Sequence, residues 1–118
     1  MADNIRFQGE GWLRLEMTAG IGLQSGDVAV IGAGLTVDLI TDADAVGVAT
    51  VMFPCSYVTE HPVVGEDDQG NAAVNIGDPV YIDGTDINAD AAGGVFYGYA
   101  LGAVLAGATT TIQIARAA

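Results

Sequence analysis

Carboxylates are the only abundant reactive side chains in this sequence, and one cluster of them has the spacing of possible metal ligands. The segment DGTDINAD brings Asp83, Asp86, Asn88 and Asp90 close together along the chain. Alternating oxygen ligands of this kind are typical of the start of a calcium loop. The full loop pattern fails, because no glycine stands at the sixth position from Asp86 and no glutamate closes the loop. The alternative is a solvated acidic turn, and we predict no metal and no cofactor.

The chain has one cysteine and one histidine, which limits the other kinds of reactive centre. A zinc site needs several such ligands. Cys55 follows an apolar run, and we expect a small buried residue rather than a nucleophile. His61 precedes a proline in an extended segment, and we expect an exposed or interface polar residue. The sequence contains no lysine for a phosphate-binding loop and no nucleophile elbow, so we predict that the protein is not an enzyme.

The charge is strongly acidic, with 15 aspartates and glutamates against 3 arginines and a net charge of -12. Nucleic-acid binding depends on lysine and arginine at the phosphates, so we predict no nucleic-acid partner. The same charge opposes binding to an anionic membrane surface. The first residues lack the apolar stretch of a signal peptide, and we expect synthesis in the cytoplasm.

Seventeen glycines separate short runs of β-branched and aromatic residues, which is typical of many short strands joined by tight turns. We therefore predict an all-β fold, a small β-barrel or β-sandwich with little helix. We expect residues 1–10 to form an extended N-terminal arm and residues 11–118 a single β domain. The expected strands lie within residues 11–18, 27–32, 35–40, 47–53, 79–83, 94–105 and 109–116.

Two Gly-Asp pairs predict a turn that is used twice. Gly26-Asp27 and Gly77-Asp78 lie 51 positions apart, and each precedes an apolar run. Gly47 and Gly98 follow the two pairs at the same distance. Glycine permits a positive φ, and aspartate can accept hydrogen bonds from the turn's own amides. We predict two pseudo-repeated units that start at these turns.

Several short motifs, taken in order, resemble the phage capsid decoration (head cement) family. They cover roughly residues 11 to 116, and each alone is weak. Two departures from the family pattern are an irregular segment at residues 52–55 and the loss of every lysine. The matching pieces lie at residues 25–28, 46–49, 51–54, 76–81, 98–101 and 106–114.

The resemblance implies a structural virion protein on the outer surface of the capsid. Its partners would be the major capsid protein and itself, as a homotrimer that stabilises contacts between capsid subunits. The label "predicted recombinase" on some family members gains no support from a lysine-free acidic chain. The alternatives are a free-standing β-barrel binding module for sugars or a host surface, and a small hydrolase of the β-clip type.

The N-terminal residues are the candidate contacts with the capsid or with other subunits. One hypothesis is an arm that becomes ordered on the capsid, with Phe7 and Trp12 as its anchors. The alternative is a frayed terminus followed by a first core strand. The candidate contact residues are Ile5, Arg6, Phe7 and Trp12.

Overall fold

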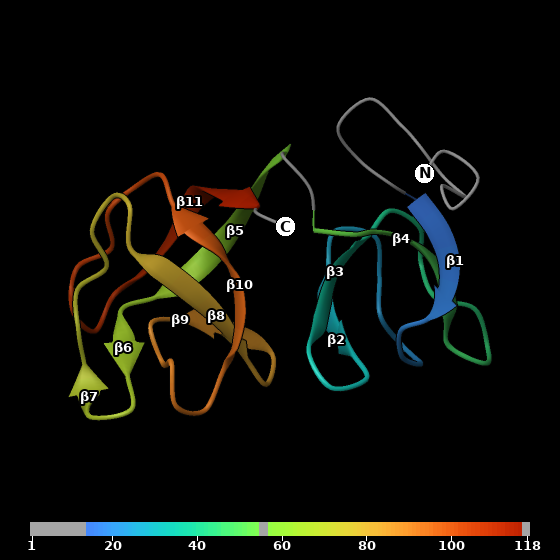
Figure 1. Ribbon diagram of the computed structural model, residues 1–118, viewed down its shortest axis with the longest axis horizontal. Coiled ribbons are helices and arrows are strands. Elements are labelled where there is room, and N and C mark those ends of the chain that lie inside the picture. Colours follow the sequence, from blue (N-terminus) through green and yellow to red (C-terminus); the bar gives the residue numbers. More distant parts are fainter. Residues whose placement is uncertain (1–13, 55–56, 117–118) are drawn as a thin grey trace, which may run out of the picture.

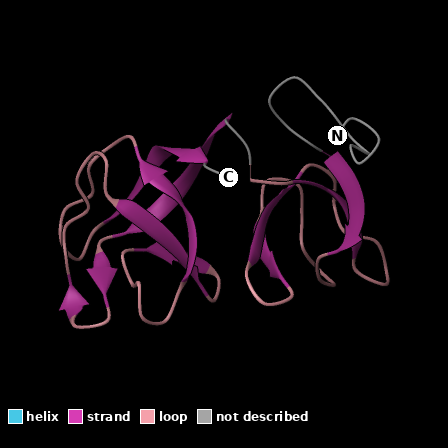
Figure 2. Ribbon diagram, viewed as in Figure 1, coloured by secondary structure: helices cyan, strands magenta, loops and turns pink. Residues whose placement is uncertain are grey.

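The structure is a computed structural model that describes residues 14–54 and 57–116. Every regular element in these ranges is a β-strand, so the all-β prediction is confirmed (Figures 1 and 2). The described part of the chain contains no helix that could span a membrane. The strands form two main sheets that lie beside each other, with β1 to β4 on the right of Figure 1 and β5 to β11 on the left.

The first sheet has four antiparallel strands in the order β1-β4-β3-β2. Alternate residues point to one face, where Ala29, Val37, Leu39 and Val51 form a small buried cluster. This period of two explains why short runs of valine and leucine become half-buried strands. The four strands are β1 (Arg14–Thr18), β2 (Val28–Ile31), β3 (Leu35–Leu39) and β4 (Val48–Met52).

The second sheet has five antiparallel strands in the order β5-β11-β10-β8-β9. It curls so that its two edges approach, since the Ala89 amide after β9 donates a hydrogen bond of 2.9 Å to the Glu66 carbonyl after β5. A short hairpin, β6 (Glu66–Asp67) with β7 (Gly70–Asn71), forms the acidic tip. The five strands are β5 (Tyr57–Val64), β8 (Pro79–Asp83), β9 (Asp86–Asn88), β10 (Val95–Ala100) and β11 (Thr109–Arg116).

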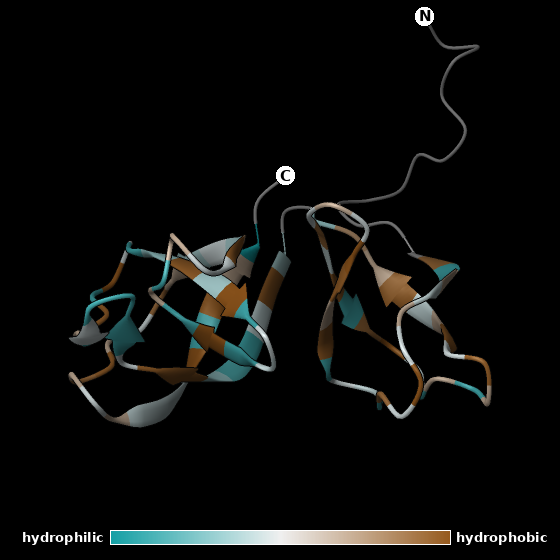
Figure 3. Cartoon of the chain, turned by 90° about the horizontal axis from the view of Figure 1, so that it is seen from below, coloured by the Kyte–Doolittle hydropathy of each residue, from teal (hydrophilic) through white to brown (hydrophobic). Residues whose placement is uncertain are grey.

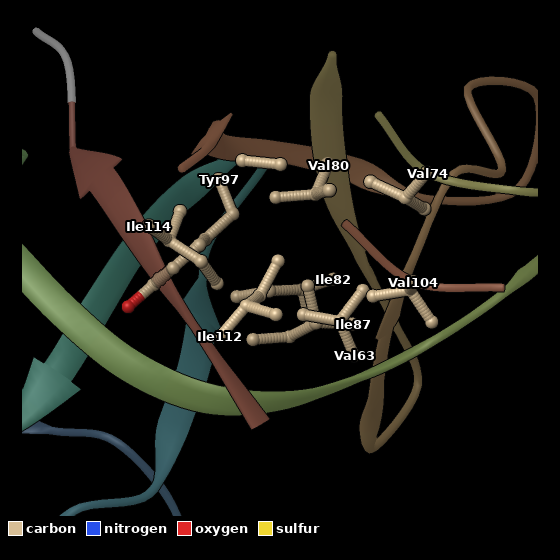
Figure 4. Close-up of a cluster of buried hydrophobic side chains, with 10 residues drawn as sticks. Val63, Val74, Val80, Ile82, Ile87, Tyr97, Val104, Ile112 and Ile114 are labelled. Atoms are coloured by element: carbon tan, nitrogen blue, oxygen red, sulfur yellow. The ribbon is translucent and has the colours of Figure 1, made fainter. Parts of the chain in front are cut away.

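The larger hydrophobic core lies inside the curl of the second sheet (Figure 4). Hydrophobic residues also line the strands of the first sheet in Figure 3. Tyr97 is the largest fully buried side chain among the described residues, and it points into this core beside Ile114. The core residues are Val63, Val74, Val80, Ile82, Ile87, Tyr97, Ala100, Val104, Ile112 and Ile114.

The strand β5 was not expected from the sequence. Its residues alternate between inward and exposed positions, and the inward residues Thr59 and His61 are polar, whereas Val63 belongs to the aliphatic core. It also contains Pro62, which a central strand does not tolerate. Because β5 lies at the edge of its sheet, Pro62 needs no ladder hydrogen bond on its open side. An edge strand with a polar inner face carries little hydrophobic signal.

The two sheets share one topology. When β9 is left out of the second sheet, the first strand along the chain lies beside the last in each sheet, the last beside the third, and the third beside the second. The strands β1, β2, β3 and β4 thus correspond to β5, β8, β10 and β11. The β6–β7 hairpin and β9 are additions to this pattern in the second sheet.

The residue registers also correspond. One row of paired residues crosses the first sheet through Val28, Asp38, Met52 and Arg14. The corresponding row crosses the second sheet through Pro79, Tyr99, Ala115 and Val58. The following row is Leu39, Val51 and Leu15 in the first sheet, and Ala100, Ile114 and Thr59 in the second. The chain therefore contains an internal structural repeat.

The repeat does not keep the constant spacing predicted from the sequence. Gly26 and Gly77 correspond at 51 positions, whereas Leu39 and Ala100 correspond at 61, because β9 and its turn are inserted between them. The predicted equivalence of Gly47 and Gly98 is therefore wrong. Gly47 lies in the turn before β4 with φ 89°, while Gly98 lies inside β10 at an irregularity in its pairing with β8.

Candidate functional site

The first predicted turn has the geometry expected of it. Gly26 has φ 92°, a left-handed conformation that favours glycine. The Asp27 carboxylate accepts a hydrogen bond of 2.8 Å from the Gln24 amide, which closes the turn. The Gly26 amide then donates to the Leu39 carbonyl, and the Leu39 amide donates to the Asp27 carbonyl, both at 2.9 Å. The turn therefore sets the register of β2 against β3.

The second turn repeats this arrangement. Gly77 has φ 93°, and the Asp78 carboxylate accepts a hydrogen bond of 2.9 Å from the Asn75 amide. Gly77 donates to the Ala100 carbonyl at 2.7 Å, and the Ala100 amide donates to the Asp78 carbonyl at 2.8 Å. The prediction of one turn used twice, built from Gly26, Asp27, Gly77 and Asp78, is confirmed. Both turns are structural, since their aspartates bind the turns' own amides.

A buried polar cluster joins the two sheets, and its centre is Asp38 on β3. Asp38 is only 7% exposed. Its carboxylate accepts hydrogen bonds from the Tyr57 hydroxyl at 2.6 Å and the Tyr97 hydroxyl at 2.5 Å. Nε2 of His61 lies 3.1 Å from the same carboxylate. Three side chains of the second sheet thus converge on one aspartate of the first.

Arg116, at the end of β11, provides the positive charge of the cluster. Its Nε donates to the Asp38 carboxylate at 3.0 Å. Its other nitrogens donate to the Thr36 hydroxyl at 2.9 Å, the Thr36 carbonyl at 2.7 Å and the Tyr97 carbonyl at 2.5 Å. The guanidinium also lies 4.0 Å from the centre of the Tyr97 ring, within the range of a cation–π contact. A buried ion pair with this many hydrogen bonds can offset the cost of removing both charges from water.

The titration of the cluster follows from these contacts. Burial raises the pKa of Asp38, but hydrogen bonds from His61, Tyr57 and Tyr97, together with the Arg116 charge, outweigh it and lower that pKa below its usual value. Burial and the Asp38 charge raise the pKa of Tyr57 and of Tyr97. Asp38 is therefore an anion, and both tyrosines are neutral donors, at neutral pH.

The chemistry open to this cluster is limited, because its polar atoms are already paired. Among the described residues, no buried side-chain nitrogen or oxygen lacks a hydrogen-bond partner. A general acid or base needs access to the proton of a bound substrate. In this arrangement the carboxylate, both hydroxyls and the guanidinium all bind protein groups. The cluster is suited to holding the two sheets in one orientation.

A groove of about 540 Å³ lies beside the cluster, between β2 and the β5 and β9 side of the second sheet. His61, Asp27 and Asp86 are the titratable residues on its walls. His61 faces Asp38 and the Asp27 carboxylate binds the Gln24 amide, so two of the three are already engaged. The expectation that His61 is exposed is wrong, since 13% of its side chain is accessible, and it lies in the contact between the two sheets of the chain.

The acidic segment considered for calcium forms a turn that binds itself. The Asn88 amide group donates to the Asp83 carboxylate at 3.2 Å, and the Asp90 carboxylate accepts from the Ala92 and Gly93 amides. No group of metal-ligating side chains occurs within residues 14–54 and 57–116. Only the tip of the segment, residues 84–86, is exposed, and Asn88 is buried on β9, so the segment fits the solvated turn that was the alternative only in part.

The predicted contact residues Ile5, Arg6, Phe7 and Trp12 lie outside the described residues, as does Cys55. The boundary of the arm at residue 10 and the single domain over residues 11–118 stay predictions for the same reason. Comparisons with family models, characterised proteins and solved structures found no match to this chain. The resemblance to the capsid decoration family rests on its motifs.

Large hydrophobic side chains are exposed at two kinds of place. Ile21, Val46, Ile76 and Leu105 lie on loops between strands and are each at least 70% exposed. Phe96 and Tyr99 lie on the outer face of the second sheet, with Tyr81 beside Phe96. Exposed apolar side chains that lie together, as Phe96, Tyr99 and Tyr81 do, mark surfaces where other molecules bind.

The sequence did not identify the polar cluster. Asp38 and Arg116 lie 78 positions apart, so no local motif joins them. One signal was present in the sequence. Asp38 interrupts the apolar run LTVDLI, and a charged residue in a strand that is apolar on both sides of it needs a partner when it is buried.

Proposed function

We propose that this protein is a structural component of a phage particle that decorates the outer surface of the capsid. It would bind major capsid protein subunits, stabilise the contacts between them without catalysis, and act as a homotrimer. The single observation that carries the proposal is the buried ion-pair cluster between the sheets. A protein that braces a shell needs a fixed geometry between its contact points, and the cluster ties β3 to β5, β10 and β11.

The exposed loop residues are the candidate capsid contacts in the described part of the chain. In the first sheet, Ile21 lies between β1 and β2, and Val46 lies between β3 and β4. In the second sheet, Ile76 precedes β8, and Leu105 lies between β10 and β11. These are corresponding loops of the repeat. Each sheet would therefore present aliphatic side chains from the same end, which suits a brace with two points of attachment.

The acidic charge supports binding to a protein shell rather than to its packaged nucleic acid. A net charge of -12 without any lysine repels phosphate and favours contact with a basic or neutral protein surface. The motif resemblance described above points to the same partner.

We expect a gene for a major capsid protein beside the gene for this chain, and the test uses expanded empty capsids assembled from the product of that gene. The purified protein is mixed with them, and binding is measured by co-sedimentation and located by electron cryomicroscopy. We expect saturable binding at three-fold positions. Ile76→Asp and Leu105→Asp should each weaken binding, whereas Asp68→Asn, on the acidic hairpin, should not. Failure of the unaltered protein to bind, with a monomeric mass in solution, would overturn the proposal.

The same assay tests the proposed N-terminal arm. A variant that lacks residues 1–9 is compared with the full chain. If Ile5, Arg6 and Phe7 contact the capsid, the truncated protein binds more weakly. Unchanged binding would assign these residues to a frayed terminus instead.

A second candidate function is sugar or host-surface binding. Phe96 and Tyr99 favour it, because exposed aromatic rings are common in such sites. The ring geometry is less favourable, since the planes of Phe96 and Tyr99 meet at 65° and those of Phe96 and Tyr81 at 73°. Edge-to-face rings leave no flat platform for a sugar. A glycan array probed with the labelled protein distinguishes the two functions.

A further inference from the structure

Part of the outer face of the second sheet, around Tyr99 and Phe96, is apolar, and no described part of the chain covers it, while Glu60 on β5 gives the same face a charged residue. Tyr99 is 44% exposed and Phe96 is 37% exposed, and their ring centres lie 5.3 Å apart. Both rings point outward because the pairing of β10 with β8 shifts register between Phe96 and Gly98. No charged residue occurs in the row that crosses this face, which consists of Val58, Ala115, Tyr99 and Pro79.

The corresponding face of the first sheet is covered, and the second sheet covers it. Val28 and Val30 point to that face and pack against the core of the second sheet. Asp38 points the same way and pairs with Arg116. The repeat therefore contains one outer face that is buried within the chain and one equivalent outer face that is open.

The surface of the second sheet that binds the outer face of the first sheet also has an equivalent, which lies in the first sheet. In the second sheet, Arg116 at the end of β11 receives Asp38. By the shared register, Ala115 corresponds to Met52, so Arg116 corresponds to Phe53 in the first sheet. Phe53 is half-buried at the end of β4, next to the small cluster of the first sheet. The first sheet thus ends in an apolar group where the second sheet ends in a charged one.

The two repeat units differ at both positions of this contact, and the two differences are of the same kind. Tyr99 stands where the repeat places Asp38, and Phe53 stands where it places Arg116. Within the chain, the contact between an outer face and a strand end is made by an ion pair. At the two corresponding positions, Tyr99 on the outer face and the half-buried Phe53 at the end of β4, both residues are aromatic. Aromatic residues are enriched where proteins bind each other, and they pack well edge to face.

We propose that the outer face of the second sheet binds a second copy of this chain, at the Phe53 end of that copy's first sheet. The contact would repeat between chains the contact that already joins the two sheets within a chain, with Tyr99 and Phe53 in place of Asp38 and Arg116. Such a head-to-tail contact uses different surfaces on the two partners, so it closes into a ring when the rotation permits and otherwise extends as a filament. The proposal does not depend on capsid binding, because it concerns the protein alone.

The first test is the mass of the purified protein in sedimentation velocity over a range of concentrations. We expect an oligomer, and we expect Tyr99→Asp to weaken association by about tenfold or more, since it places a charge at the centre of the contact. Val46→Asp is the matched control, because it adds the same charge at a residue that is 70% exposed, in the loop between β3 and β4 and at the other end of β4 from Phe53. Circular dichroism verifies that both variants fold. A monomeric unaltered protein, or equal effects of the two variants, would overturn the proposal.

The second test distinguishes a head-to-tail contact from a symmetric one. In a Cys55→Ser background, Tyr99→Cys and Phe53→Cys proteins are prepared separately, mixed and oxidised with copper phenanthroline. We expect disulfide-linked pairs in the mixture and few in either protein alone. Efficient cross-linking of Tyr99→Cys with itself would show that the outer faces meet each other, which contradicts the proposal. Capsid binding that persists in a protein without self-association would overturn this inference and the proposed homotrimer, and it would leave the proposed binding to the capsid standing.

Discussion

Asp38 and Arg116 form an ion pair of 3.0 Å between β3 of the first sheet and β11 of the second. The Arg116 side chain is fully inaccessible to solvent, and 10% of the Asp38 side chain is accessible. A buried pair of this kind stabilises a fold mainly by its geometry, since each charge is costly to bury alone. The pair thus makes the relative orientation of the two sheets depend on a few side chains.

Asp38→Asn should destabilise the protein by about 3 kcal/mol or more, because it leaves the Arg116 guanidinium buried without a counter-charge. The free energy of unfolding is measured by urea denaturation. Arg116→Gln and the double variant complete a mutant cycle, in which we expect the two losses to be far from additive. Asp68→Asn, at the exposed hairpin tip, is the control and should change stability by less than about 0.5 kcal/mol. Additive losses would contradict a direct interaction.

The stability contributed by Asp38 should be lost in acid. Its folded-state pKa lies below its unfolded value of about 3.9, so the unfolded chain binds more protons as the pH falls through this range. The contribution is therefore complete at neutral pH and decreases once the pH falls below about 4. The measurement is the difference in unfolding free energy between the unaltered protein and Asp38→Asn at several pH values. Both proteins share the other 14 acidic residues, so the pH dependence that these residues give to the unfolding free energy largely cancels in the difference. A difference that stays constant down to pH 2 would contradict the assignment.

The features that were predicted correctly in detail are the two turns, whose geometry depends on residues that are adjacent in the sequence. Gly26-Asp27 and Gly77-Asp78 were identified because a positive φ and an aspartate cap need only adjacent residues. The equivalence of Gly47 and Gly98 was wrong, because sequence spacing does not reveal that β9 is an addition to one unit.

The polar cluster was missed for a related reason. Its members come from β3, β5, β10 and β11, and only the packing of the two sheets brings them together. Strand β5 was missed because its inward residues Tyr57 and His61 belong to this cluster, while Val63 alone adds little hydrophobic signal. The buried Asp38 in an apolar strand was the one signal that a partner had to exist elsewhere.

Asp27→Ala and Asp78→Ala should destabilise the protein by similar amounts, about 1 kcal/mol each. Each removes a carboxylate that accepts one turn amide, at 2.8 Å from Gln24 and 2.9 Å from Asn75, in the same geometry. Thermal unfolding followed by circular dichroism measures both. Asp86→Ala, at an exposed position of β9, serves as the control. A large loss in one turn and none in the other would show that the two turns are not equivalent in energy.

Gly98→Ala should be among the most damaging single-methyl changes in the chain, although Gly98 has no positive φ. A Cβ at this position would collide with the carbonyl oxygen of Ala115 and lie 2.9 Å from Cγ2 of Ile114. Both atoms belong to the neighbouring β11 and cannot move without disturbing the core. We expect a loss of about 2 kcal/mol or more in urea denaturation. Gly22→Ala is the comparison, because at φ 85° it has backbone strain but no atom within 4 Å of its Cβ. If Gly98→Ala proved no worse than Gly22→Ala, the close approach of β10 to β11 would not be a constraint on the fold.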